Sequence, residues 1–552
     1  MFSSPKTSWL KSPYHTRGLD PLGAQAPAIN IYGQLLPGIT NVTDRARYYS
    51  FYPWMIRAFE LNSSEKTYEA LREWVRRSDC LFSMIGIRHG LASEGKDQSL
   101  HTRALIGSNT LTSVVQRLDD ESEVDFSVYA QIEDSPHRYF KNHLGGLRQY
   151  YIGTFDGLGL MIRKGQGVAN TNEIGVPMAE AMDSYVESEL FIKTVSSGKV
   201  SRQVLDDLVS FCPCQLMASN DEHRTLQDLF FARNSFDNEL GQQRRNTLGL
   251  ILNLIRETDE HGSQDAIFDQ NTFRSSVYTG ALSDGSSWSL PESLEFTRSQ
   301  WSVYQKHELL SSAIQSIFWV ALRMIEESAD PLWSTEDFIN WFSTHNVVKQ
   351  AASSIGADGF AAAQKYAANS LPSIQDWLDE NHEMQLVQVA LAGCNENNAG
   401  DYSVILQNAG LVLLALLARD DLEKEAYSPL HFSNDFFLLY PLNLKSLRQK
   451  VASEWETMST ASWLAWVAGH WGIEAHFRVA LRKLRFQNKD TLHILPTDYG
   501  LVVQELPSPT YTTPRFSQGI QILEDLGAIT KNESSHTILT SLGQALREET
   551  HV

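Results

Sequence analysis

The chain has 552 residues, of which 42% are hydrophobic, enough for roughly three or four domains with cores of their own. Its formal net charge of −20 excludes a general nucleic-acid coat, although one local basic patch could still bind DNA. The four cysteines are too scattered for a disulfide framework, which favours a reducing, cytoplasmic setting. The amino terminus has no apolar signal segment, and the longest apolar run, 409–418, is too short to span a bilayer. We therefore expect no membrane partner.

Helical periodicity dominates the chain and predicts a mainly α protein, a multi-domain helical body with a small C-terminal α+β module. In chain order, the expected parts are an N-terminal helical region with an extended proline-rich lead (1–130), a helical region (131–256), a helical domain (294–460), and a basic helix followed by the small module (461–552). Residues 257–293 are dense in Gly, Ser, Asp and Thr, which predicts a polar linker or long loop.

The segment 40–60 combines six aromatic residues with three arginines. Such a mixture can form a stacking platform for single-stranded nucleic acid. The alternative, which we favour, is a packed core segment whose arginines face acidic neighbours. Pro53 should break or kink any helix there.

Three short motifs were weighed as sites of chemistry. Arg88-His89-Gly90 resembles the opening motif of histidine phosphatases, in which the histidine attacks phosphate, but it follows helical sequence and no matching downstream set is present. Cys212-Pro213-Cys214 with His223 lacks the two-residue spacing that lets two thiolates wrap one zinc, so buried thiols are expected. His307-Glu308 begins like a zincin helix, but Ser311 occupies the position of the second ligand, which leaves His307 as a helix-surface histidine. We therefore predict no metal site, no cofactor and no catalytic residue, and lean against an enzyme.

A cluster of cations stands out near the C-terminus of this acidic chain. Its members are expected on one helix and are the main candidates for contact with phosphate: Arg478, Arg482, Lys483, Arg485 and Lys489. Three of the arginines share a helical face at i, i+4 and i+7. The alternative is a solvated face paired with Glu474 and its neighbours.

The last forty or so residues carry a modular pattern. Thr512-Thr513-Pro514 predicts a helix start, and apolar spacing continues the helix to Leu526 before Gly527 ends it. Two short strands, 528–530 and 537–539, should follow, and then a final helix capped by Thr540. This order resembles the second half of a winged-helix domain.

The resemblance implies contact with DNA or docking to a protein in nearly equal measure. The exposed face of the first helix would present Arg515, Gln518 and Gln521 to bases and phosphates. Glu524 and Asp525 give that helix a net negative charge, which opposes deep entry into a groove.

Two further segments, 36–54 and the turn 145–151, resemble in style the uncharacterised bacterial proteins of anti-phage defence operons. The resemblance implies a non-enzymatic, cytoplasmic DNA-binding or scaffold subunit of a bacterial anti-phage defence or DNA-handling complex. Its expected partners are double-stranded DNA and other subunits of the same operon. The alternatives are a nuclease or phosphoesterase with a dispersed active site, and a transcription regulator.

Overall fold

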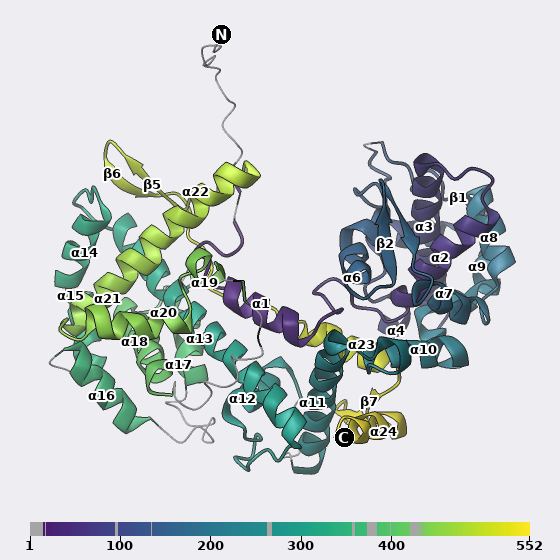
Figure 1. The fold of residues 1–552 in the computed structure, drawn as a ribbon. Coiled ribbons are helices and arrows are strands. Elements are labelled where there is room, and N and C mark those ends of the chain that lie inside the picture. Colours follow the sequence, from purple (N-terminus) through teal and green to yellow (C-terminus); the bar gives the residue numbers. More distant parts are fainter. Residues whose placement is uncertain are drawn as a thin grey trace, which may run out of the picture.

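The structure is a computed structural model that describes residues 15–551 except 17, 94–97, 134, 262–267, 356–358, 372–382, 398, 420–429, 431 and 434. Helices dominate these residues, and their longer strands form two-stranded antiparallel pairs, which confirms the mainly α prediction. Buried side chains gather into two large cores, so the chain folds as two lobes, and α1, α11 to α13 and α23 lie between them (Figure 1).

The first lobe is built mostly from the N-terminal half of the chain. Its helices are α1 Ala26–Leu35, α2 Tyr48–Asn62, α3 Tyr68–Ala92, α4 Ser99–Thr102, α5 Ser108–Arg117, η1 Leu147–Tyr151, α6 Ile152–Gly157, α7 Gly175–Asp183, α8 Ser188–Ser197, α9 Arg202–Asp207, η2 Val209–Phe211, η3 Pro213–Ala218, α10 Asn220–Phe230, η4 Asn234–Phe236, α11 Glu239–His261 and α12 Gln270–Thr279. Its strands pair as β1 Val124–Asp125 with β4 Lys199–Val200, and as β2 Met161–Lys164 with β3 Gly167–Asn170.

The second lobe surrounds the C-terminal part of a long shared helix, α13 Glu292–Glu326. Its other elements are α14 Thr335–Thr344, α15 Asn346–Ile355, α16 Phe360–Ser370, α17 Glu383–Gly393, α18 Tyr402–Ala418, α19 Phe436–Leu439, α20 Leu444–Lys450, η6 Val451–Trp455, α21 Thr460–Trp466, η7 Val467–Glu474, α22 Ala475–Gln487, and the antiparallel strands β5 Ile494–Thr497 and β6 Gly500–Val503.

Helix α13 joins the two cores. Its N-terminal part contributes Trp301 and Tyr304 to the first core, and its C-terminal part contributes Leu309 through Ile325 to the second. By length and composition it could cross a bilayer, but 94% of its apolar window is buried inside the protein, as in a core helix. His307 is buried in it and not on the surface: its Nδ1 donates to the Val303 carbonyl, and burial lowers its pKa to about 4.

The predicted linker 257–293 contains helix α12, which the sequence pattern did not predict. Asp269 caps it by accepting a hydrogen bond from the Thr272 amide at 2.8 Å. Phe273 and Val277, four residues apart on one face, are buried in the first core, and Tyr278 is buried in the second. The polar composition of 257–293 therefore did not reveal this helix, whose buried apolar residues pack into the two cores.

The segment 40–60 is core, as the favoured alternative predicted. All six of its aromatic side chains are buried. Four of them, Tyr48, Phe51, Tyr52 and Trp54, contact one another along α2. Buried rings cannot form a stacking platform for bases. Arg45 pairs with Asp525 at 3.0 Å and Arg47 with Glu222 at 2.9 Å, both fully buried. Pro53 lies inside α2, which continues through it.

The C-terminal elements follow the predicted order: α23 Phe516–Asp525, the antiparallel pair β7 Ile529–Lys531 and β8 Thr537–Leu539, and α24 Ser541–Glu549. Thr540 caps the last helix through the Gly543 amide, as predicted. Helix α23, however, begins after Arg515, which adopts a left-handed backbone at φ 60°, and not at Pro514.

The expected unit 461–552 is divided between the lobes. Helix α22 and the β5–β6 pair pack in the second core, whereas α23, β7 and α24 complete the first. The intervening link is fastened to α13, because Glu308 accepts hydrogen bonds from the amide and hydroxyl of Thr512 at 2.7 and 2.6 Å. The C-terminal module is thus part of the main body.

Candidate metal centre

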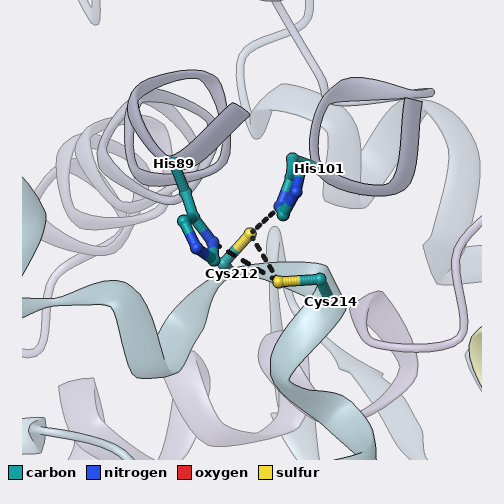
Figure 2. A group of neighbouring side chains, drawn as sticks. All are labelled: His89, His101, Cys212 and Cys214. Carbon is teal, nitrogen blue, oxygen red and sulfur yellow. Dashed lines mark hydrogen bonds between the residues drawn. The ribbon is translucent and has the colours of Figure 1, made fainter. Parts of the chain in front are cut away.

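Four side chains from three separate segments meet in the first lobe (Figure 2). His89 comes from the last turn of α3, and His101 from α4. Cys212 and Cys214 flank Pro213, at the start of η3. All four ligand atoms lie within 4.8 Å of one another.

The measured spacings match the edges of a zinc tetrahedron. Zn–S bonds of about 2.3 Å and Zn–N bonds of about 2.0–2.1 Å imply edges of about 3.8 Å between two sulfurs and about 3.5 Å between sulfur and nitrogen. The two Sγ atoms are 3.5 Å apart, Cys212 Sγ is 3.5 Å from His101 Nδ1, and Cys214 Sγ is 3.4 Å from His89 Nδ1. A cation can therefore be held with little rearrangement of these side chains.

Two glycines one turn apart bring the histidines together. A Cβ at Gly86 would lie 2.6 Å from Leu105 Cδ1 and 2.9 Å from the His101 carbonyl, and one at Gly90 would lie 3.0 Å from Thr102 Cγ2 and 3.3 Å from His101 Cβ. Because both positions lack a side chain, α4 can lie directly against α3. The His89 and His101 rings consequently sit with centroids 4.4 Å apart.

A buried ion pair holds the cysteine segment. Arg47 donates to the Cys212 carbonyl, and its guanidinium is bound by both carboxylate oxygens of Glu222. Ser50 also donates to that carboxylate. Arg47 and Glu222 are both completely buried. This pair therefore holds the backbone of Cys212 in place.

The two thiols behave as a proton-sharing pair. A hydrogen bond with Cys212 lowers the pKa of Cys214 to about 5, and a further hydrogen bond from Gln215 Nε2 favours the same thiolate. Burial raises the pKa of Cys212 well above its usual range. Thiolate is the form that binds metal, so the site already favours one of the two charges it needs.

The sequence predicted no metal site at Cys212-Pro213-Cys214 with His223, but the two cysteines meet two other histidines. His223 Nε2 donates to the Leu526 carbonyl at 2.8 Å and takes no part in the cluster. His89, considered only within a phosphatase-like tripeptide, is the nearer partner, while Arg88 forms two hydrogen bonds with Asp206. The ligand pairs lie more than a hundred residues apart in the chain, so no local spacing pattern could have connected them.

The cations predicted to bind nucleic acid fall into two groups on α22. Arg478, Arg485 and, just beyond the helix, Lys489 are exposed, and no acidic group in the described part of the chain lies within ion-pair distance of them. Arg482 instead donates to the Leu439 carbonyl and covers the Tyr440 ring, and Lys483 donates to the carbonyls of residues 19 and 20. The alternative pairing with Glu474 is not formed, because that carboxylate binds His470 at 2.9 Å.

The expected exposed face of the winged-helix-like module is wrong. Gln518 and Gln521 are only 7% and 3% exposed, and their amides donate to Asp44 and Asp525. Arg515 donates to the Leu36 carbonyl and lies over the Tyr32 ring. The polar face of α23 is turned toward α1 and the following loop because the module completes the first core.

No family model, curated protein or solved structure matches this chain.

Proposed function

We propose that His89, His101, Cys212 and Cys214 bind one zinc ion whose role is structural. The observation that carries this proposal is a set of two sulfur and two nitrogen atoms within 4.8 Å of one another, three of whose spacings are close to the edges of a zinc tetrahedron. Two thiolates and two imidazoles suit Zn²⁺, and four protein ligands leave no open position for a water or substrate. The ion would join three segments of the chain, α3, α4 and η3.

Metal analysis of the full-length chain tests the proposal. After dialysis against metal-free buffer we expect about one zinc per chain, by the four-ligand stoichiometry of structural sites. The double variant Cys212→Ser/Cys214→Ser should lose it, whereas Cys394→Ser, which removes a thiol of the second lobe, should retain it. Co²⁺ in place of zinc should give the visible absorption of tetrahedral thiolate coordination. A wild-type chain that takes up neither metal after reconstitution would rule the site out.

We infer in addition that the protein is a non-enzymatic subunit that contacts DNA or partner subunits through α22. The supporting observation is the row of exposed cations without acidic partners, Arg478, Arg485 and Lys489, on a chain of formal charge −20. The setting implied by the sequence resemblance is a bacterial anti-phage defence or DNA-handling complex.

Charge reversal tests this second role. The variant Arg478→Glu/Arg485→Glu/Lys489→Glu should lower affinity for duplex DNA by about a hundredfold at low salt. The slope of log affinity against log salt should become less negative by about 0.9 for each of the three lost phosphate contacts. The control Lys199→Glu/Arg202→Glu/Arg224→Glu changes the net charge equally on the first lobe and should leave the slope unchanged. Salt-insensitive binding, or equal loss in both variants, contradicts the DNA role; cleavage of the DNA would favour the nuclease alternative.

A further inference from the structure

A shallow groove runs along the first lobe beside η1 and the β2–β3 hairpin. Two adjoining pockets of about 590 and 550 Å³ form it and share Arg148, Ile152 and Arg163 as lining residues. A third pocket of about 470 Å³ continues it through Val42 and Tyr150. We call the first two pockets together the arginine groove. Both of the segments that suggested a defence-operon resemblance, 36–54 and 145–151, contribute to its walls.

The groove has a one-sided charge. Among the described residues, no aspartate or glutamate lines either of its two pockets, and Asp44 lines the third pocket that continues them. The side chains of Arg148 and Arg163 are exposed on its walls and make no hydrogen bond or ion pair with the described residues. The chain carries twenty more acidic than basic groups. The two exposed arginines therefore make this part of the surface locally positive, which attracts anions.

Two further arginines lie at the floor, and neither faces a carboxylate. Arg515 lines the groove and donates to the Leu36 carbonyl; Arg244 lies behind Pro37 and Gly38 and donates to the Pro37 carbonyl at 3.1 Å. Burial lowers the pKa of both guanidiniums, that of Arg244 to about 10. The Nε atom of each is buried without a hydrogen-bond partner.

The other buried arginines are of two kinds: Arg76 donates to four backbone carbonyls, whereas others pair with carboxylates. Each of three faces a carboxylate: Arg45 with Asp525 at 3.0 Å, Arg47 with Glu222 at 2.9 Å, and Arg274 with Glu308 at 3.6 Å. Desolvated charges without such a partner are costly, by several kcal/mol per ion in general. Among the described residues, Arg515 and Arg244 thus have no carboxylate partner of the kind that Arg45, Arg47 and Arg274 have.

We propose that the arginine groove binds the phosphate groups of a nucleotide or of a single nucleic-acid strand. Three arginines, Arg148, Arg163 and Arg515, line it, and guanidinium groups recognise phosphate through paired hydrogen bonds. Tyr68 and Tyr150 lie on the walls, where aromatic rings can stack on bases. Each pocket, of about 590 and 550 Å³, exceeds a phosphate ion and falls in the range of about 300–1,000 Å³ typical of small-ligand sites. This site is separate from the zinc centre and from α22, and it depends on neither.

The test uses the full-length protein and measures binding of a fluorescently labelled oligo-dT strand, of ATP and of inorganic triphosphate. Arg148→Glu/Arg163→Glu changes two exposed side chains and should keep the fold, as circular dichroism can verify. We expect it to weaken binding of whichever probe the wild type holds by at least about tenfold, the scale of one or two lost charge-assisted contacts. The matched control Arg202→Glu/Arg224→Glu should change affinity by less than about twofold, because surface pairs of this kind contribute little.

The probes distinguish the source of the phosphate. Tight binding of ATP and triphosphate with weak binding of the strand identifies a nucleotide site, and the reverse identifies a strand site; both support the proposal. The α22 triple variant should bind the preferred probe as the wild type does, which separates this site from the DNA role inferred above. Absence of binding by all three probes, or equal weakening in the groove variant and its control, overturns the proposal.

Discussion

Removal of zinc by a chelator should lower the free energy of unfolding of the first lobe by about 4 kcal/mol. The reference is the zinc-loaded protein at free zinc about a thousandfold above the dissociation constant, because a ligand that binds only the folded state stabilises it by mass action. The reason lies in the connections that the ion makes. α4 has only four residues, Ser99–Thr102, too few to form an isolated helix, and the metal would tie it to α3 and η3. Denaturant unfolding with and without a chelator measures the difference.

Hydrogen exchange locates the loss. After chelation, amides of α3's last turn, α4 and η3 should exchange faster, whereas α14 to α22 in the second lobe should keep their protection. Cys212→Ser/Cys214→Ser should match the chelated wild type and show no further response to chelator. Cys394→Ser should respond as the wild type does. Stability that is identical with and without chelator, in a protein shown to contain zinc, would contradict a structural role for the ion.

The second large effect concerns the buried pair beneath the metal centre. Replacement of Glu222 by alanine should reduce the free energy of unfolding by about 3–5 kcal/mol, because it leaves the guanidinium of Arg47 buried without a counter-charge. Arg47 and Glu222 are both completely inaccessible to solvent. Since Arg47 also binds the Cys212 carbonyl, the same variant should weaken zinc affinity by about tenfold or more, the range seen for residues that orient metal ligands.

An exposed pair on the same helix provides the control. Asp221 pairs with Arg224, and their side chains are 57% and 72% exposed. Asp221→Ala should therefore change stability by less than about 1 kcal/mol and leave zinc affinity unchanged. Glu222→Gln keeps the shape and some hydrogen bonds, so its loss should be intermediate. If Glu222→Ala proved no more harmful than Asp221→Ala, the pair would not be the support that its burial indicates.

The features that the sequence determined are those set by neighbouring residues. Helical periodicity gave the mainly α class, and the C-terminal order α23, β7, β8, α24 was readable because Gly527 and Thr540 act within a few residues of their own position. The core role of 40–60 also followed from composition, since so many large rings are most stable when buried together.

Only the tertiary structure decided which residues meet. Cys212 and His101 are 111 positions apart, and their approach depends on the close contact of α3 with α4, which no spacing rule records. The direction of Arg515, Gln518 and Gln521 was likewise set by what α23 packs against: periodicity shows that a helix has two faces, but not which partner covers the polar one. The arginine groove has the same origin, because its three lining arginines come from η1, β2 and the residue just before α23. Such sites arise from long-range packing, and their charges acquire meaning only when the fold shows which of them lack a counter-charge.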